Sequence, residues 1–189
     1  FDTMQETQRV KHLSLNGQTK TALDKATVGG WKYDIVDQGF KANMPDLCAA
    51  VGLAQLRIYD QEMLPERKRI FEHYNSRLKL HNWAILPPME LGPRNSSCHL
   101  FQLRIRGLDE NGRNAMMRSL ADDGVGVNVH YVPMPMLTLF QKLGYDSSQY
   151  PQAFEFYQNE VTLPVYNGLT IDQLDQVLDS LERAVAKVS

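Results

Sequence analysis

Apolar and polar side chains alternate most regularly in the stretch HLFQLRIR at residues 99–106. Successive side chains of an extended chain point to opposite faces, so this alternation predicts a half-buried strand. Its buried face would be formed by Phe101, Leu103 and Ile105. A second alternating stretch, VGVNVHY at residues 125–131, predicts another strand, and the two prolines that follow are expected to end it.

Most of the other apolar positions recur every three or four residues, which is the spacing of one helix face. Pro65 is expected to kink or split the longest helix, because its ring removes a backbone donor and clashes with the preceding turn. Thr170 and Gln173 have the spacing of a capping box that opens the last helix. The expected helices cover residues 4–15, 45–80, 112–122, 136–143 and 151–160, and the segment from 170 onward.

Residues 18–39 show neither pattern and contain Gly29 and Gly30, so a long loop with at most a short extended piece at 33–36 is expected there. A loop of this length is more often functional or mobile than a plain connection. The remaining elements run in the order helix, strand, helix, strand and helices. They predict an α/β fold, a small sandwich in which helices cover one antiparallel sheet.

Composition narrows the possible functions. The 189 residues contain 20 Lys and Arg against 22 Asp and Glu, for a formal net charge of −2. A protein that binds nucleic acid irrespective of sequence needs a basic surplus, so no nucleic-acid partner is expected. No apolar run approaches the roughly 18 residues of a membrane span, so no membrane partner is expected either. Cys48 and Cys98 are too few for a disulfide framework and favour a reduced, cytoplasmic setting.

The chain begins at Phe1 rather than Met, and neither the charged nor the apolar segment of a secretory signal follows. Its opening reads like the middle of a protein. We therefore expect that these 189 residues are not the whole functional unit.

The sequence lacks the short motifs that are typical of common binding and catalytic sites: GxGxxG, Walker A, HExxH, CxxC and GxSxG. The five histidines are scattered without the spacing of metal ligands, so no metal site is expected. Cys48 lies among small apolar residues and is expected to be a buried, unreactive thiol.

Two places carry side chains suited to binding. Lys41 and Asn43 come directly before the start of the long helix, where free backbone N–H groups and the helix dipole favour an anion such as phosphate. The alternative is that Asn43 only ends a loop and Lys41 is solvated. His130 falls on the opposite face of its predicted strand from the valines, where it could point into a cleft. The alternative is a surface histidine or a hydrogen-bonded structural one.

Several segments, taken in order, resemble the sequence blocks of one enzyme family. They read GFKANMPDLCAAVGLAQL, ERKRIFEHYNSRL, HLFQLRI, LADDGVGVNVHYVPMP and TLPVYNGLT. By these segments the chain resembles, over nearly its whole length, the C-terminal part of the DegT/StrS family of pyridoxal-phosphate-dependent nucleotide-sugar aminotransferases. Several motifs in the same order are far more specific than any one of them.

The resemblance implies the C-terminal part of a fold-type-I aminotransferase, whose large domain binds pyridoxal 5'-phosphate. Residues 1–44 would be the tail end of the large cofactor-binding domain with an active-site loop, 45–82 a long interdomain helix, and 83–189 the small C-terminal α/β domain. Members of the family form homodimers with two shared active sites, so the same assembly is implied here.

The resemblance also implies roles for particular residues. Asn43 would contact the cofactor phosphate of the neighbouring subunit, with Lys41 as its ionic neighbour. Many members carry Asn where this chain has Lys41, and Arg where it has Asn43. Four residues match segments near the sugar-nucleotide substrate: His130, Tyr131, Trp31 and Tyr33.

The implied activity is transfer of an amino group, from glutamate as amino donor, to a keto-sugar nucleotide in sugar or cell-surface polysaccharide biosynthesis. The family's catalytic lysine, which forms a Schiff base with the cofactor, belongs to a segment upstream of this chain's first residue. The resemblance therefore assigns no catalytic residue within the chain, and the chain alone is expected to be inactive.

Two alternatives stay open. Some members of the same family have lost the lysine and act as pyridoxal-phosphate-dependent sugar dehydratases. A free-standing interaction or regulatory module would instead fold as a stable monomer. The small side chains at residues 49–54 argue against such a module, because they suit packing on a large domain or a second subunit.

Overall fold

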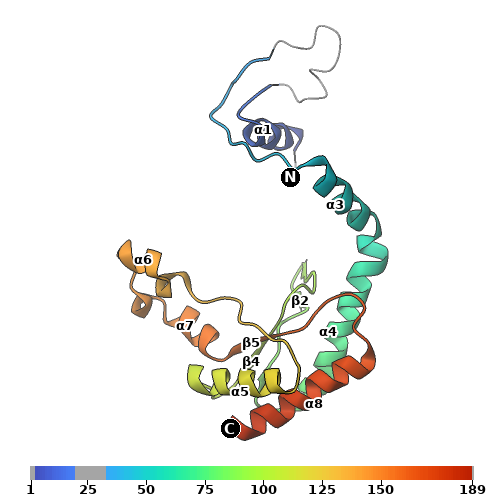
Figure 1. The fold of residues 1–189 in the computed structure, drawn as a ribbon, viewed down its shortest axis with the longest axis vertical. Coiled ribbons are helices and arrows are strands. Elements are labelled where there is room, and N and C mark those ends of the chain that lie inside the picture. Colours follow the sequence, from blue (N-terminus) through green and yellow to red (C-terminus); the bar gives the residue numbers. More distant parts are fainter. Residues whose placement is uncertain (1–2, 20–32, 189) are drawn as a thin grey trace. The chain divides into compact units, whose positions relative to one another are not determined.

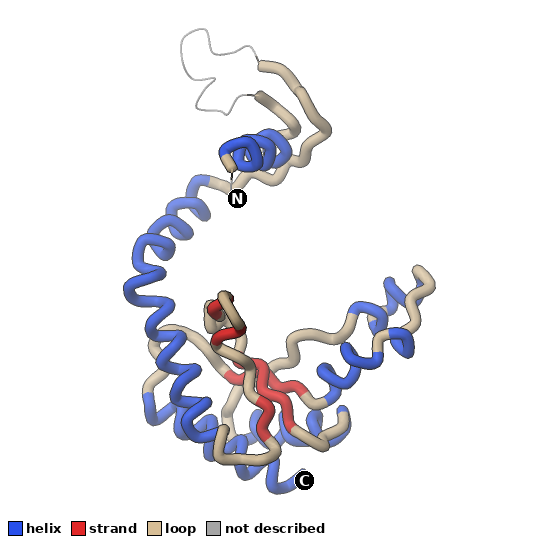
Figure 2. Tube along the Cα trace, turned by 180° about the vertical axis from the view of Figure 1, so that it is seen from behind, coloured by secondary structure: helices blue, strands red, loops and turns tan. Residues whose placement is uncertain are grey.

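The computed structural model describes residues 3–19 and 33–188 of the chain. The chain divides into two units, Phe1–Arg57 and Ile58–Ser189, and Figure 1 and Figure 2 show the elements of each. Among the described residues, no helix combines the length and the apolar character that crossing a membrane requires.

The first unit begins with helix α1 (Met4–Ser14), where the apolar spacing predicted it. The helix starts at a capping box, in which the side chains of Thr3 and Glu6 each accept a hydrogen bond from the other's backbone N–H at 3.2 Å. The chain later returns to the C-terminal end of α1, where the Phe40 carbonyl accepts from the Asn16 N–H at 2.9 Å. The described residues of the first unit are therefore tied together by backbone pairing.

Three helical segments follow one another without interruption: α3 (Asp46–Ile58), the π-helix η1 (Tyr59–Met63) and α4 (Leu64–Leu78). Pro65 lies in the first turn of α4, directly after the π-helix, so the helix changes type at the position where a kink or a split was expected but is not interrupted. A proline has no N–H to give to the carbonyl four residues back. The turn before it is wider than an α-helical turn, and the Leu64 N–H bonds to the Tyr59 carbonyl, five residues back.

A three-stranded antiparallel sheet forms the centre of the second unit. Its strands lie in the order β1 (Ala84–Ile85), β4 (Phe101–Ile105) and β5 (Glu160–Leu163). The half-buried strand predicted from alternation is β4, whose apolar residues are buried and whose polar residues are half-buried. In its pairing with β5, Phe101 lies opposite Leu163 and Arg104 opposite Glu160. A separate hairpin joins β2 (Glu90–Leu91) to β3 (Arg94–Asn95).

The prediction of a strand at residues 125–131 is wrong. This segment makes only an isolated bridge, in which the backbone groups of Asn128 and Thr162 pair at 3.3 and 2.7 Å. An extended chain alternates its side chains whether or not it joins a ladder, so alternation alone could not tell the two apart. The third strand is instead β5, which the sequence hides because all four residues of EVTL are buried and show no alternation.

Helix α4, together with α5 (Glu110–Asp122) and α8 (Ile171–Val188), covers one face of this sheet. In Figure 1 the helices α5 and α8 lie in front of the strands, and from behind, in Figure 2, the strands lie in front. The ring of Phe101 packs edge-on against Phe71 and Tyr74 of α4, with centroids 4.9 and 5.0 Å apart. The core of the second unit therefore lies between β4 and these helices.

The last helix begins where its capping box predicted. The Thr170 N–H donates to Oε1 of Gln173 at 3.0 Å, and the Gln173 N–H donates to Oγ1 of Thr170 at 3.2 Å. The short helices expected at 136–143 and 151–160 are also present. They are η2 (Met134–Met136), α6 (Thr138–Lys142), η3 (Ser147–Gln149) and α7 (Pro151–Gln158), and α6 and α7 lead away from the sheet (Figure 1).

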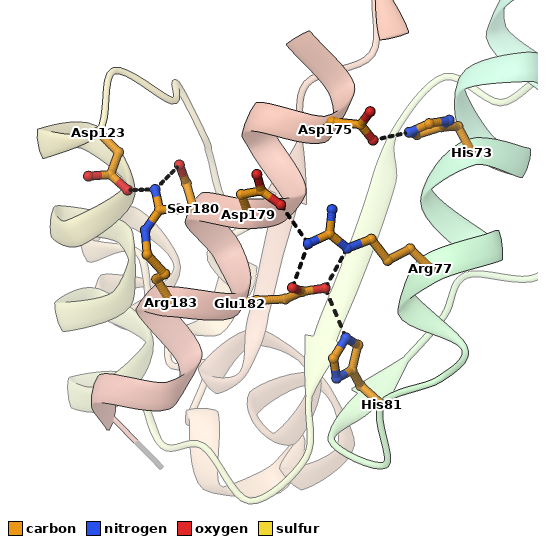
Figure 3. A network of polar contacts seen from close by, with 9 residues as sticks. All are labelled: His73, Arg77, His81, Asp123, Asp175, Asp179, Ser180, Glu182 and Arg183. Carbon is orange, nitrogen blue, oxygen red and sulfur yellow. Dashed lines mark hydrogen bonds and ion pairs between the residues drawn. The ribbon is translucent and has the colours of Figure 1, made fainter. Parts of the chain in front are cut away.

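Polar side chains join α4 to α8 along their exposed edge (Figure 3). Arg77 donates two hydrogen bonds to the Glu182 carboxylate, at 2.7 and 2.6 Å, and a third to Asp179 at 2.6 Å. His81 lies 2.9 Å from the same Glu182 carboxylate. The Arg77 guanidinium holds the pKa of Glu182 below its usual value. This network fixes the two helices relative to each other at the rim of the core.

Candidate functional site

Lys41 and Asn43 lie on the segment that leads from the turn after α1 to the start of α3. The backbone of Lys41 forms an isolated bridge with Leu15. Just before it, Gly39 approaches Gly17 so closely that a Cβ on Gly39 would lie 2.2 Å from the Gly17 nitrogen. Only glycine permits this approach. The segment carrying Lys41 and Asn43 is therefore held against the end of α1.

The surroundings of Lys41 and Asn43 suit an anion. Both residues are exposed, and α3 begins three positions after Asn43, at Asp46. The Ala49 N–H donates to the Pro45 carbonyl at 2.9 Å, and the N–H groups that precede it in the helix have no intrahelical acceptor. A cation, an amide and free N–H groups at the positive end of a helix dipole fit a phosphate group.

Three other residues that were singled out from the sequence belong to the first unit. Tyr33, one of the residues matched to a substrate segment, is exposed, and Trp31 lies outside the described residues. The prediction for Cys48 is wrong, because this thiol is exposed on α3. Small apolar neighbours predicted burial, but every residue of α3 is exposed in this structure. Among the described residues, no group of His, Cys, Asp and Glu is arranged to hold a metal ion.

His130 belongs to the second unit, where it lines a cavity of about 270 Å³. The polar side chains of the wall come from His99, Asn128, His130 and Thr162. His99 is itself held by Nη1 of Arg67, at 3.3 Å from Nδ1. The cavity lining therefore combines hydrogen-bonding side chains with apolar ones, among them Pro164 and Val165 after β5.

Three groups of β4 and β5 hold His130 in place. Its backbone carbonyl accepts a hydrogen bond from Nε2 of Gln102 at 2.6 Å, and its backbone N–H donates to Oε2 of Glu160 at 3.0 Å. Its ring nitrogen Nδ1 lies 2.8 Å from Oγ1 of Thr162. The Tyr131 ring stands edge-on to the His130 ring, with centroids 4.7 Å apart, and is 72% exposed.

Glu160 connects this site to the interior of the second unit. Its side chain is fully buried, at 0% exposure, and Oε1 accepts a hydrogen bond from the Thr162 hydroxyl at 2.5 Å. Burial raises the pKa of Glu160, while the hydrogen bonds from Thr162 and the His130 backbone and the charge of Arg113 oppose that rise. Arg113 is also buried and lies over the Tyr157 ring, 4.7 Å from its centroid.

His130, singled out from the sequence, lines this cavity, whereas the sequence did not point to Glu160 and Thr162, which contact His130. The available signal was a carboxylate and a hydroxyl alternating inside the short run EVTL, next to an apolar segment. Buried polar side chains in a strand are rare unless they bond to one another or to a functional group. The candidate residues are divided between the units, with Tyr33, Lys41 and Asn43 in the first and His130 and Tyr131 in the second.

Comparison with known proteins gives a family match over almost the whole chain. The model of the DegT/DnrJ/EryC1/StrS aminotransferase family matches residues 2–182. The spore coat polysaccharide biosynthesis protein SpsC of Bacillus subtilis is 30% identical over 184 residues, which are 94% of this chain and 46% of SpsC. A UDP-4-amino-4,6-dideoxy-N-acetyl-beta-L-altrosamine transaminase of Campylobacter jejuni is 25% identical over 181 residues, which are 95% of this chain and 45% of that protein.

Solved structures share the fold over the same extent. The sugar aminotransferase Spr1654 of Streptococcus pneumoniae, in its PMP-form, is 36% identical with a TM-score of 0.86, and the match covers 100% of this chain and 47% of that one. A PLP-form of the same protein matches with a TM-score of 0.84. The chain thus spans about half the length of the relatives that it matches.

Proposed function

Because the chain belongs to the DegT/DnrJ/EryC1/StrS aminotransferase family, we propose that it forms the C-terminal part of a pyridoxal-phosphate-dependent sugar aminotransferase. The reaction transfers an amino group from glutamate to a keto-sugar nucleotide, in sugar or cell-surface polysaccharide biosynthesis. The observation that carries this proposal is the similarity to Spr1654 over the whole chain, at 36% identity. The names of SpsC and of the Campylobacter jejuni transaminase support the substrate class.

Pyridoxal 5'-phosphate supplies the electron sink that amino-group transfer needs. In this chain, Lys41 and Asn43 bind its phosphate, Lys41 through its charge and Asn43 through its side-chain amide. Their exposure directly before the N-terminus of α3 supports this role, since free N–H groups there add to the binding of an anion. Residues of this chain thus anchor the phosphate of the cofactor bound in the neighbouring subunit.

The sugar nucleotide contacts His130 and Tyr131, and the segment with Trp31 and Tyr33 approaches it. A cavity with histidine, asparagine and threonine side chains in its wall supports this assignment for His130. Imidazole and amide groups hydrogen-bond sugar hydroxyls, and the exposed Tyr131 ring offers an apolar face to a sugar or a base.

The functional assembly is a cytoplasmic homodimer in which each active site draws residues from both subunits. The exposed apolar side chains of α3 support this part of the proposal. Leu47, Val51, Leu53 and Leu56 are all exposed in the isolated chain. A run of apolar side chains on one helix, next to small ones, suits an interface that excludes water.

The proposal implies a longer protein that contains these residues, and the experiment compares that protein with residues 1–189. Each sample receives pyridoxal 5'-phosphate, glutamate and a UDP-linked keto sugar, and 2-oxoglutarate is measured. We expect 2-oxoglutarate from the longer protein and none from residues 1–189, which lack the family's lysine segment. Loss of water from the sugar without 2-oxoglutarate would indicate the dehydratase instead, and no turnover by the longer protein would refute both.

A further inference from the structure

We propose that Glu160 and Thr162 are positioning residues that fix the tautomer of His130, so that its ring offers Nε2 as a hydrogen-bond acceptor to the ligand in the cavity. The part that concerns the tautomer stands on the contacts of this chain alone. The part that concerns the ligand rests on the proposed function, in which His130 meets a sugar nucleotide.

The directions of the hydrogen bonds follow from the one donor that cannot change, together with the charge state of Glu160. A backbone N–H always donates, so Oε2 of Glu160, 3.0 Å from the His130 nitrogen, must accept. The other carboxylate oxygen, Oε1, lies 2.5 Å from Oγ1 of Thr162. We take Glu160 as ionised, the form that its two hydrogen bonds and the charge of Arg113 favour against the effect of burial. An ionised carboxylate can only accept, and a short O–H···O⁻ contact is typical of a hydroxyl that donates to one.

The Thr162 hydroxyl has one proton, and it donates this proton in the hydrogen bond to Glu160. Oγ1 of Thr162 also lies 2.8 Å from Nδ1 of His130, and at that contact it can only accept. The proton between them must therefore be on Nδ1. A neutral imidazole carries one proton, so Nε2 is left with its lone pair.

This chain of hydrogen bonds is built on rigid parts of the fold. Glu160 and Thr162 are both buried in β5, which is paired with β4 along its length. Gln102 of β4 holds the His130 carbonyl at 2.6 Å. The ring is thereby fixed in position as well as in tautomer, which lowers the ordering cost when a ligand binds.

The tautomer selects the chemical group that His130 recognises. A lone pair at Nε2 attracts a hydroxyl or an amide N–H and repels a keto or phosphate oxygen. In a sugar nucleotide, the groups that fit are sugar hydroxyls and N–H groups. His130 therefore hydrogen-bonds the sugar or the base, and the anionic diphosphate is bound elsewhere.

The substitution Glu160→Gln tests the assigned tautomer because it should reverse the direction of the hydrogen bonds from Glu160 through Thr162 to His130. The backbone N–H of His130 still needs an acceptor, so the amide oxygen of the new side chain turns to it, and the NH₂ group faces Thr162. The Thr162 hydroxyl then accepts from that NH₂ and gives its own proton to Nδ1. The His130 ring must now carry its proton on Nε2.

The readout is the pair of ring ¹⁵N chemical shifts of His130, in the intact protein labelled with ¹⁵N-histidine and assigned with His130→Gln. Spectra are taken at a pH high enough that the ring ¹⁵N chemical shifts no longer change with pH and the imidazole is neutral. We expect the proton on Nδ1 in the wild type and on Nε2 in Glu160→Gln. Thr162→Ser keeps the Nδ1–H form, whereas the isosteric Thr162→Val loses it and gives a mixture.

A proton on Nε2 in the wild type, or an unchanged tautomer in Glu160→Gln, would overturn the proposal. If Glu160→Gln does not fold, the wild type and the Thr162 pair decide. Kinetics test the ligand part: the KM for the sugar nucleotide should rise about fivefold to tenfold in Thr162→Val, more than kcat falls, and recover in Thr162→Ser. An unchanged KM overturns the ligand part. Absent amino transfer with the expected tautomers refutes only the proposed function.

Discussion

Replacement of Leu78 by alanine tests whether the buried face of α4, formed by Ile70, Phe71, Tyr74 and Leu78, is part of the core that supports the His130 site. The side chain of Leu78 is 0% exposed and packs in the same cluster as Tyr74 and Phe101. The substitution removes three carbon atoms, worth together about 2.4 kcal/mol at about 0.8 kcal/mol for each buried methylene. The cavity left behind adds to this loss, so we expect the free energy of unfolding to fall by about 3–4 kcal/mol.

Leu80, two residues further on, provides the matched control. It is the same residue type and is 76% exposed, so Leu80→Ala should change the free energy of unfolding by less than about 0.5 kcal/mol. The chain has two tryptophans, and Trp83 packs against the core. With Trp31→Phe as background, the fluorescence of Trp83 reports urea unfolding of the second unit. If both leucine variants unfold at the same urea concentration, with the same dependence of the free energy of unfolding on urea, the assignment of Leu78 to the core is refuted.

Three further predictions concern charge, backbone and cofactor. Arg77 lowers the pKa of Glu182 in the folded state, so this carboxylate contributes stability above its unfolded pKa of about 4.3 and loses that contribution as the pH falls through the folded value. In urea titrations, the difference in the free energy of unfolding between wild type and Glu182→Gln should therefore shrink between about pH 6 and about pH 3. A difference that stays constant over this range would contradict the prediction. Gly39→Ala places a Cβ 2.2 Å from the Gly17 nitrogen, so limited proteolysis should cut the segment before α3 faster than in wild type; equal rates would argue against the close approach. Asn43→Ala should weaken binding of pyridoxal 5'-phosphate to the intact protein by about tenfold, as expected for a lost hydrogen bond to a charged group, and an unchanged affinity in an absorbance titration would exclude the contact.

Local patterns were enough to predict the elements whose faces differ in polarity. The side chains of β4 alternate between core and solvent, and the buried face of α4 recurs every three or four residues. Strand β4 lies where the sequence predicted, and α4 lies within the helix expected at 45–80. The capping box at Thr170 also predicted the start of α8, because capping depends on residues only three positions apart. These features need no knowledge of distant parts of the chain.

The features that the sequence could not reveal depend on contacts between distant segments. Strand β5 is buried on both faces, so it carries no period, and its partners lie about sixty positions earlier in the chain. The site around His130 is assembled by Glu160 and Thr162, thirty and thirty-two positions away. Cys48 was expected to be buried because small apolar neighbours often pack, yet burial depends on a partner surface that composition does not place.

We propose that the protein containing this chain moves nitrogen from glutamate to a sugar nucleotide. The most direct measurement follows the nitrogen itself. The longer protein is incubated with pyridoxal 5'-phosphate, ¹⁵N-glutamate and a UDP-linked keto sugar, and the sugar nucleotide is analysed by mass spectrometry. We expect ¹⁵N to appear in the sugar nucleotide in step with 2-oxoglutarate. A sugar nucleotide that is converted without taking up ¹⁵N, or that is not converted at all, would contradict it.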